Sequence, residues 1–140
     1  MIKSKTFFEK CNTSSSLINL AYRDYIAARF LLNNQLILQG LMLASTAVEK
    51  YLKAIIVFNL DNDERYNYHF DRFQKLKDLL LKSEFKMINE FDPVFLEVLE
   101  KAFKLRYYDG LKDDIEIGIY LNQFIGELDI VVNRLEKYIM

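Results

Sequence analysis

The chain is 140 residues long, and 51% of its residues are hydrophobic while 28% are charged. This length fits one domain with a sizeable core. Its 19 basic and 20 acidic residues are interspersed and give a net charge of −1, which excludes the electrostatic footprint of a general nucleic-acid binder. Four glycines and one proline leave few sites for tight turns, so the composition favours helices over a β-sandwich or barrel.

Composition and segment lengths also predict a cytoplasmic protein. Residues 1–16 lack the continuous apolar segment of a signal peptide, and no apolar run approaches the roughly 20 residues of a membrane-spanning helix. The one cysteine, Cys11, excludes an internal disulfide framework and a cysteine-rich zinc site. We therefore expect no membrane association, no metal and no cofactor.

The first expected helix covers residues 17–32, where apolar side chains recur at spacings of three and four. Serines at 14–16 offer N-cap oxygens for this helix, and the pair Asn33-Asn34 ends it. Residues 1–16 are predicted to be a loose N-terminal leader, and residues 17–140 the folded domain.

The second expected helix, over residues 36–59, is strongly apolar. Its stripe at alternating spacings of four and three consists of Ile37, Leu41, Ala44, Val48, Tyr51, Ile55 and Phe58. Further apolar residues widen this stripe beyond one face, so the helix is predicted to be central, with neighbours on several sides.

Three more helices complete the expected architecture. A shorter helix is predicted over 70–81, and Asp92-Pro93 is a strong start signal for a helix that ends near Arg106. Asp113 and Glu116 resemble a capping box, from which the last helix is expected to run to the C-terminus. The predicted fold is an all-α, antiparallel bundle of four to five helices.

Glu49 and Lys53 stand out because they place two charges in the middle of the apolar second helix. At a spacing of four they can pair on one face, and if buried each needs a partner, because an isolated charge in a core is very costly. Asp24 and Arg106 are the expected further partners. Three interpretations stay open: a structural ion-pair cluster that fixes helix register, a pocket facing a ligand or RNA, and simple surface exposure.

Several segments together resemble the HEPN family (higher eukaryotes and prokaryotes nucleotide-binding domain). Residues 21–32 (AYRDYIAARFLL) are similar to the family's opening helix, and residues 47–54 (AVEKYLKA) are close to its second helix. His69 stands where members often carry a His-Asp-Leu start, although Phe70 intervenes before Asp71. These matches extend from about residue 17 to residue 110.

The segment from Arg106 to Asp109 looks like the family's Arg-Tyr-Pro-Asp segment, with Tyr108 in place of proline. The resemblance implies a helical bundle that commonly forms homodimers. Many members partner a nucleotidyltransferase-type antitoxin, and others are RNases that carry a histidine four to six residues after an arginine at the dimer cleft. In this chain no histidine follows Arg106 within that distance, so the chain departs from the RNase pattern.

The remaining polar candidates each have a structural and a functional interpretation. His69 can serve as a general base near neutral pH or as a helix cap. Arg106 suits phosphate recognition, or it pairs with Asp109 or Glu49. Tyr107 and Tyr108 can stack a nucleotide base, or they pack in the core or at a dimer interface. The sequence contains no glycine-rich phosphate loop, no HExxH motif and no nucleophile elbow.

The leading interpretation is a non-catalytic or degenerate HEPN protein that forms homodimers and binds a nucleotidyltransferase-type partner or a nucleotide or RNA ligand. Its expected ligand-binding residues are Asp24, Glu49, Lys53, Arg106 and Tyr107. One alternative is a metal-independent RNase toxin that uses Arg106 with Tyr108, Asp109 or His69 in a dimer cleft. Another is a structural helical adaptor with no ligand.

Overall fold

The computed structural model describes residues 7–59, 73–82, 84–104 and 119–139. Within these ranges the chain forms five α-helices and one short 3-10 helix, and no strand. The predicted all-α helical bundle is therefore confirmed. The elements are α1 (Phe7–Asn33), α2 (Ile37–Asn59), α3 (Phe73–Lys82), η3 (Lys86–Glu90), α4 (Pro93–Lys104) and α5 (Leu121–Ile139).

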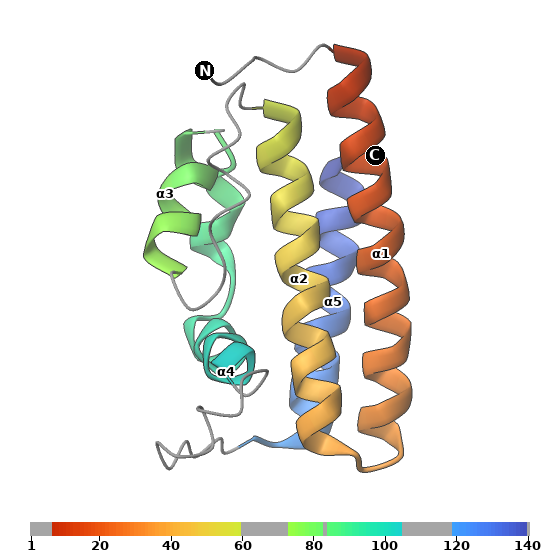
Figure 1. The fold of residues 1–140 in the computed structure, drawn as a ribbon. Helices are drawn as coiled ribbons and strands as arrows, with labels where there is room; N and C mark the ends of the chain where they lie inside the picture. The colour runs from red at the N-terminus through yellow and green to blue at the C-terminus, as the bar shows by residue number, and fades with distance from the viewer. Residues whose placement is uncertain (1–6, 60–72, 83, 105–118, 140) are drawn as a thin grey trace.

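Three long helices stand side by side and form the body of the bundle (Figure 1). α1 runs antiparallel to both α2 and α5, whereas α2 and α5 run in the same direction (Figure 1). α3 and α4 lie on the opposite side of α2 from α1, and α4 is seen nearly end on, so it crosses the long helices (Figure 1). α2 contacts α1, α3, α4 and α5, as expected for the central helix.

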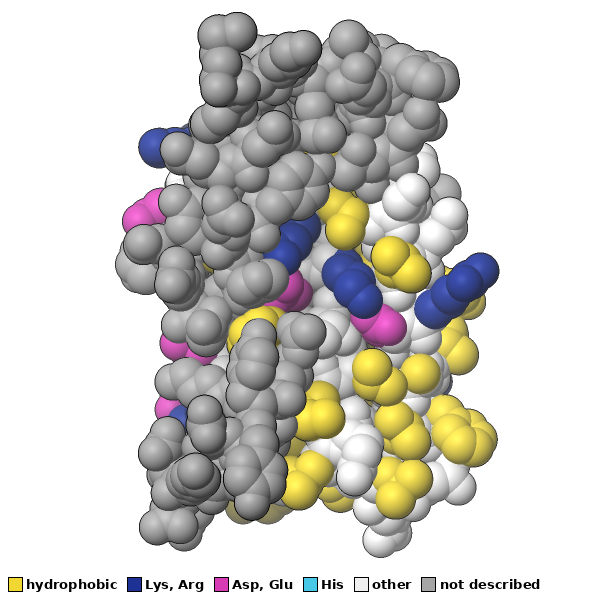
Figure 2. Space-filling view, viewed as in Figure 1, with side chains coloured by type: hydrophobic (Ala, Val, Ile, Leu, Met, Phe, Trp, Pro, Cys, Tyr) yellow, Lys and Arg dark blue, Asp and Glu magenta, His cyan; other side chains and the backbone are white. Residues whose placement is uncertain are grey.

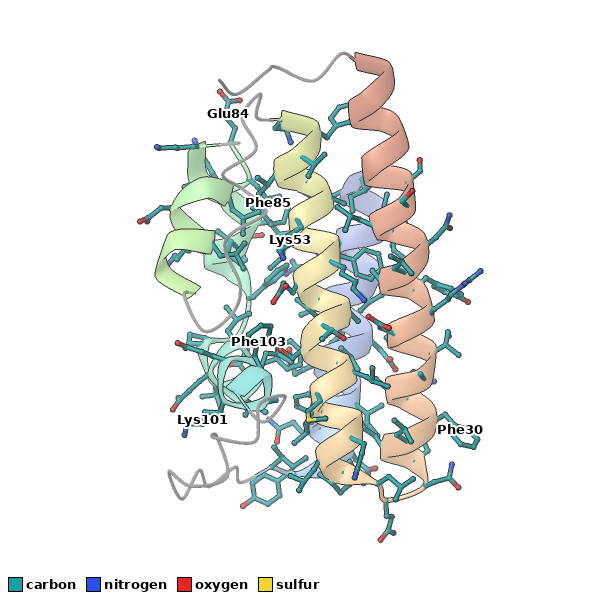
Figure 3. The ribbon with its side chains drawn as sticks, viewed as in Figure 1. Phe30, Lys53, Glu84, Phe85, Lys101 and Phe103 are labelled. Carbon is teal, nitrogen blue, oxygen red and sulfur yellow. The ribbon has the colours of Figure 1, made fainter. Side chains whose placement is uncertain are left out.

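The central position of α2 follows from its sequence. Its observed bounds, Ile37–Asn59, match the expected 36–59. Every residue from Ala47 to Val57 except Lys50 is buried, because apolar side chains surround this half of the helix and must be covered on all sides. Phe85 and Phe103 point from the α3–α4 layer toward α2 (Figure 3), and both are fully or almost fully buried.

The first helix begins earlier than the sequence pattern suggested. α1 starts at Phe7, so residues 7–16, expected to be part of a loose leader, are helical. The serines at 14–16 lie inside the helix instead of capping it. Neither proline nor glycine occurs between residues 7 and 33, so nothing in that stretch forces the helix to stop, and serine is tolerated in a helix interior at a modest cost.

The turn between α1 and α2 is tight, and backbone hydrogen bonds within it end the first helix. Leu36 N donates to Leu31 O at 2.9 Å, and Gln35 N donates to Leu32 O at 3.1 Å, which is the Schellman pattern of a helix C-terminus. Gln35 takes a positive φ of 64° at this point. The predicted break at Asn33-Asn34 is therefore confirmed to within one residue.

The link between α3 and α4 contains η3, and the predicted start of α4 is confirmed. Asp92 Oδ1 accepts a hydrogen bond from Val94 N at 3.1 Å, so Asp92 acts as an N-cap with Pro93 at the first helical position. The expected α3 helix is present, over Phe73–Lys82 in place of 70–81.

The last helix starts later than expected. α5 begins at Leu121, and Ile119 and Tyr120 before it are not helical. The prediction that this helix runs without interruption from the capping box is therefore wrong. The box itself, at 113–116, lies outside the described residues. The apolar pattern from Phe124 to Leu135 is buried as predicted.

Three contacts connect the layers to one another. Ser45 Oγ on α2 donates a buried hydrogen bond of 2.9 Å to Leu99 O on α4. The rings of Phe95 and Phe124 lie 5.2 Å apart between α4 and α5. Phe85 meets Tyr138 of α5 edge to face at 4.7 Å, which joins the α3–α4 link to the C-terminal helix.

α2 lies close to α1 at Gly40, which generates a prediction. A Cβ at Gly40 would lie 2.7 Å from Leu32 Cγ and Cδ2, and Leu32 is fully buried. We expect Gly40→Ala to lower the free energy of unfolding by about 1–3 kcal/mol, because an overpacked core side chain must shift. Urea denaturation followed by circular dichroism measures this change in the free energy of unfolding.

Gly126 provides the matched control. It also lies within a helix, but a Cβ there meets nothing within 4 Å. We expect Gly126→Ala to raise stability by about 0.5–1 kcal/mol, because alanine has the higher helix propensity. Equal effects of the two substitutions would contradict the close approach of α1 and α2.

Candidate functional site

Four polar residues of α2 form a stripe along one face of the helix. Thr46, Glu49, Lys50 and Lys53 follow one another at spacings of three, one and three, which places them on one face of a helix. With Asp24 of α1 they make up what we call the α2 polar seam. Figure 2 shows basic and acidic side chains next to one another across this face, with hydrophobic side chains gathered below them.

Asp24 joins α1 to the seam. Its Oδ2 forms an ion pair with Lys50 Nζ and accepts a hydrogen bond of 3.1 Å from Thr46 Oγ1. The sequence interpretation placed Asp24 opposite Glu49 and Lys53. The structure instead pairs it with Lys50, a residue that was not singled out.

Glu49 and Lys53 form the predicted pair. Lys53 Nζ lies 2.9 Å from Glu49 Oε1, and the two side chains are only 11% and 6% exposed. Simple surface exposure, one of the three interpretations, is therefore wrong. The burial and the direct pairing support the structural ion-pair cluster, because two buried charges in contact satisfy each other's electrostatic requirement.

A second polar cluster lies between α1, α2 and α5, and the sequence interpretation missed it. Tyr51 is fully buried, and its hydroxyl donates to Glu136 Oε1 at 2.6 Å. Tyr25 donates to Asp129 Oδ1 at 2.5 Å. Arg29 Nε lies 3.0 Å from the same oxygen, with the geometry of an ion pair and not of a directed hydrogen bond. We call these five residues the tyrosine–carboxylate cluster.

The tyrosines of this cluster are suited to structure and not to proton transfer. Burial, followed by the hydrogen bond to Glu136, raises the pKa of Tyr51 far above its usual value. Burial and the hydrogen bond to Asp129 raise the pKa of Tyr25 in the same direction. Both phenols stay protonated at neutral pH, so they act as donors and cannot serve there as general bases.

A sequence signal for this cluster exists. Asp129 and Glu136 are seven residues apart on the last helix, next to its apolar stripe, so they share a face. The apolar periodicity identifies Tyr51 only as a member of its stripe, although a buried tyrosine needs an acceptor for its hydroxyl.

The side of α1 that faces away from the bundle carries a row of exposed apolar residues. Tyr22, Ile26 and Phe30 follow at a spacing of four and are 50%, 47% and 67% exposed. We call these three residues the outer face of α1. Phe30 points away from the other helices (Figure 3), and Arg23 lies in the same surface region. The opposite side of α1 contributes Ala21, Ala28 and Leu32 to the core, so this helix has apolar residues on both sides.

The other predicted site residues lie outside the described part of the chain: His69, Arg106, Tyr107, Tyr108 and Asp109. Of the expected ligand-binding set, the structure therefore places Asp24, Glu49 and Lys53, all within the α2 polar seam. Among the described residues, no group of three His, Cys, Asp or Glu side chains could hold a metal ion. No described helix is both long and apolar enough to span a membrane.

Comparisons with protein-family models, with curated proteins and with solved structures found no match to this chain.

The buried Glu49–Lys53 pair generates a stability prediction. We expect Lys53→Met to lower the free energy of unfolding by about 3–5 kcal/mol, because it leaves the Glu49 carboxylate buried without its lysine. The control is Lys101→Met, which breaks the Glu97–Lys101 pair at the same spacing on the exposed side of α4. That change should cost less than about 0.5 kcal/mol. Similar small costs at both sites in urea denaturation would show that Lys53 and Glu49 are not buried together.

The tyrosine–carboxylate cluster predicts a loss of stability at alkaline pH. The pKa of Tyr51 is higher in the folded state than in the unfolded state, so the unfolded chain loses this proton first as the pH rises past about 10. The stabilisation is thus fully present below pH 10 and declines above it. Removing the phenol should make this decline shallower by about 1.4 kcal/mol per pH unit.

Chemical denaturation of Tyr51→Phe and of the parent chain between pH 9 and 11.5 measures this difference. Tyr120→Phe, which removes an exposed hydroxyl, should keep the parent slope. A Tyr51→Phe slope equal to that of the parent would contradict the buried, hydrogen-bonded state of Tyr51.

Proposed function

We propose that this chain is a helical interaction module of the HEPN type that forms a homodimer through the outer face of α1. The observation that carries the proposal is the exposure of Tyr22, Ile26 and Phe30 in one row. A contiguous row of large apolar side chains open to water marks a surface that another protein covers, whereas single exposed apolar residues need no explanation.

The symmetry of this row favours a second copy of the same chain as the occupant. Tyr22 and Phe30 are equidistant from Ile26 along the helix, so two antiparallel copies related by a two-fold axis at Ile26 place Tyr22 of each against Phe30 of the other. Arg23 and Arg29 lie about 120° apart around the helix. They therefore fall on opposite edges of the contact and do not meet in the dimer.

The basic residues of the two polar clusters favour a protein over a nucleic acid as the bound partner. Lys50, Lys53 and Arg29 each pair with a carboxylate. Binding to RNA depends on cations that can neutralise phosphates, and these cations are already neutralised within the bundle. The α2 polar seam is thus better suited to fixing the register of α1 and α2 than to binding phosphate.

The resemblance adds the kind of heterologous partner to the proposal, a nucleotidyltransferase-type protein. Whether the chain also cleaves RNA depends on Arg106, Tyr108, Asp109 and His69. No feature of the described residues favours that activity over binding.

Solution mass of the Phe30→Ser variant tests the proposal. We expect the parent chain to be a dimer at micromolar concentration. Burying a phenylalanine side chain stabilises a complex by about 1.5–3 kcal/mol. Because a two-fold dimer contains the substitution twice, its dissociation constant should rise roughly 100-fold or more. Sedimentation equilibrium across a dilution series measures both species.

The matched control is Leu81→Ser, which removes another exposed apolar side chain, on α3, across α2 from α1 (Figure 1). It should leave the dimer unchanged, and circular dichroism should show that both variants are folded. A monomeric parent chain, or equal effects of the two substitutions, would contradict the proposal.

A further inference from the structure

The N-terminal parts of α4 and α5 form a small cavity that is open to solvent and that the proposed dimer does not use. Its volume is about 250 Å³. The apolar part of its lining comes from Val94, Phe95 and Val98 of α4, Phe124 of α5, and Ile119 and Tyr120 just before α5. Val94 and Tyr120 are also among the most exposed large hydrophobic residues, so apolar surface continues from the cavity out to the solvent.

The charges around this α4–α5 cavity have one sign. Asp92 and Glu127 line it, and no lysine or arginine does so among the described residues. The N-termini of two helices contribute about half a positive charge each. Two full carboxylate charges exceed this sum by about one unit, so the described lining is negative overall. It should therefore repel phosphates and other anions.

The size of the cavity limits what can fill it. Pockets for cofactors and drug-sized ligands usually measure about 300–1,000 Å³, and this cavity is smaller. It is large enough for one bulky side chain. The negative charge of a nucleotide is unfavourable beside Asp92 and Glu127.

We propose that the α4–α5 cavity binds a short peptide segment of a partner protein, in which one aromatic or aliphatic side chain is flanked by lysine or arginine. The apolar side chain fills the cavity against Phe95 and Phe124, and the flanking cations face Asp92 and Glu127. The charge complementarity selects this occupant over an acidic or neutral segment. The cavity shares no residue with the outer face of α1, so it constitutes a second binding surface, beyond the proposed dimer.

Titration with three capped tripeptides, followed by two-dimensional ¹⁵N–¹H NMR, tests this proposal. The first peptide is lysine–phenylalanine–lysine, the second replaces both lysines with glutamate, and the third replaces phenylalanine with serine. We expect the first to shift the amide signals of Val94, Val98, Gln123 and Phe124 in a saturable way. The other two should bind at least about tenfold more weakly.

The double variant Asp92→Asn with Glu127→Gln separates specific recognition from general attraction. Asparagine is as good an N-cap as aspartate, so α4 keeps its start. The control, Glu97→Gln with Glu100→Gln, removes the same amount of charge from residues of α4 that do not line the cavity. The first double variant should weaken binding of the dilysine peptide at least about fivefold, and the control should not.

Equal binding of all three peptides, shifts away from the cavity, or equal weakening by the two double variants would overturn the proposal. The same titration in the Phe30→Ser background reports on the cavity whether or not the chain dimerises. A failure of this proposal is therefore distinguishable from a failure of the proposed dimer.

Discussion

α2 is covered on nearly every side, and it carries two charges in its buried half. The pairing of Lys53 with Glu49 is what allows this. α2 contacts α1, α3, α4 and α5 at once, which leaves no fully solvated face for a charge between Ala47 and Val57. Each charge on α2 therefore needs a partner within the bundle. Asp24 supplies one for Lys50, and by doing so fixes α1 against α2.

The same requirement accounts for the second polar cluster. Tyr51 lies on the α5 side of α2 and is fully buried, so its hydroxyl needs an acceptor, which is Glu136. Tyr25 and Arg29 share Asp129 in the same way. Polar contacts on both sides of α2 thus restrict how the three long helices can slide along one another. These internal polar contacts do not account for the exposed apolar row on the outer face of α1, which is the basis for the proposed dimer.

The sequence predicted the helices well where apolar periodicity and capping residues agreed. α2 and the Asp92-Pro93 start of α4 are examples. The predictions were wrong at the start of α1 and at the start of α5. α1 begins before the three serines, and α5 begins after the capping-box pattern, because such local signals do not by themselves decide where a helix begins. The Glu49–Lys53 pair could be predicted from its spacing. The Lys50–Asp24 and Tyr51–Glu136 contacts join residues 26 and 85 positions apart, so they depend on how the helices pack, which one chain's periodicity does not specify.

The central functional claim is that two copies meet antiparallel at Ile26, and disulfide trapping tests it most directly. In a Cys11→Ser background, Ile26→Cys places the two thiols beside the two-fold axis, whereas Asn19→Cys places them roughly 21 Å apart along the helices, beyond the reach of a disulfide. The account predicts rapid covalent dimers from Ile26→Cys under mild oxidation and almost none from Asn19→Cys. Equal trapping at both positions, or none at Ile26→Cys, would contradict it.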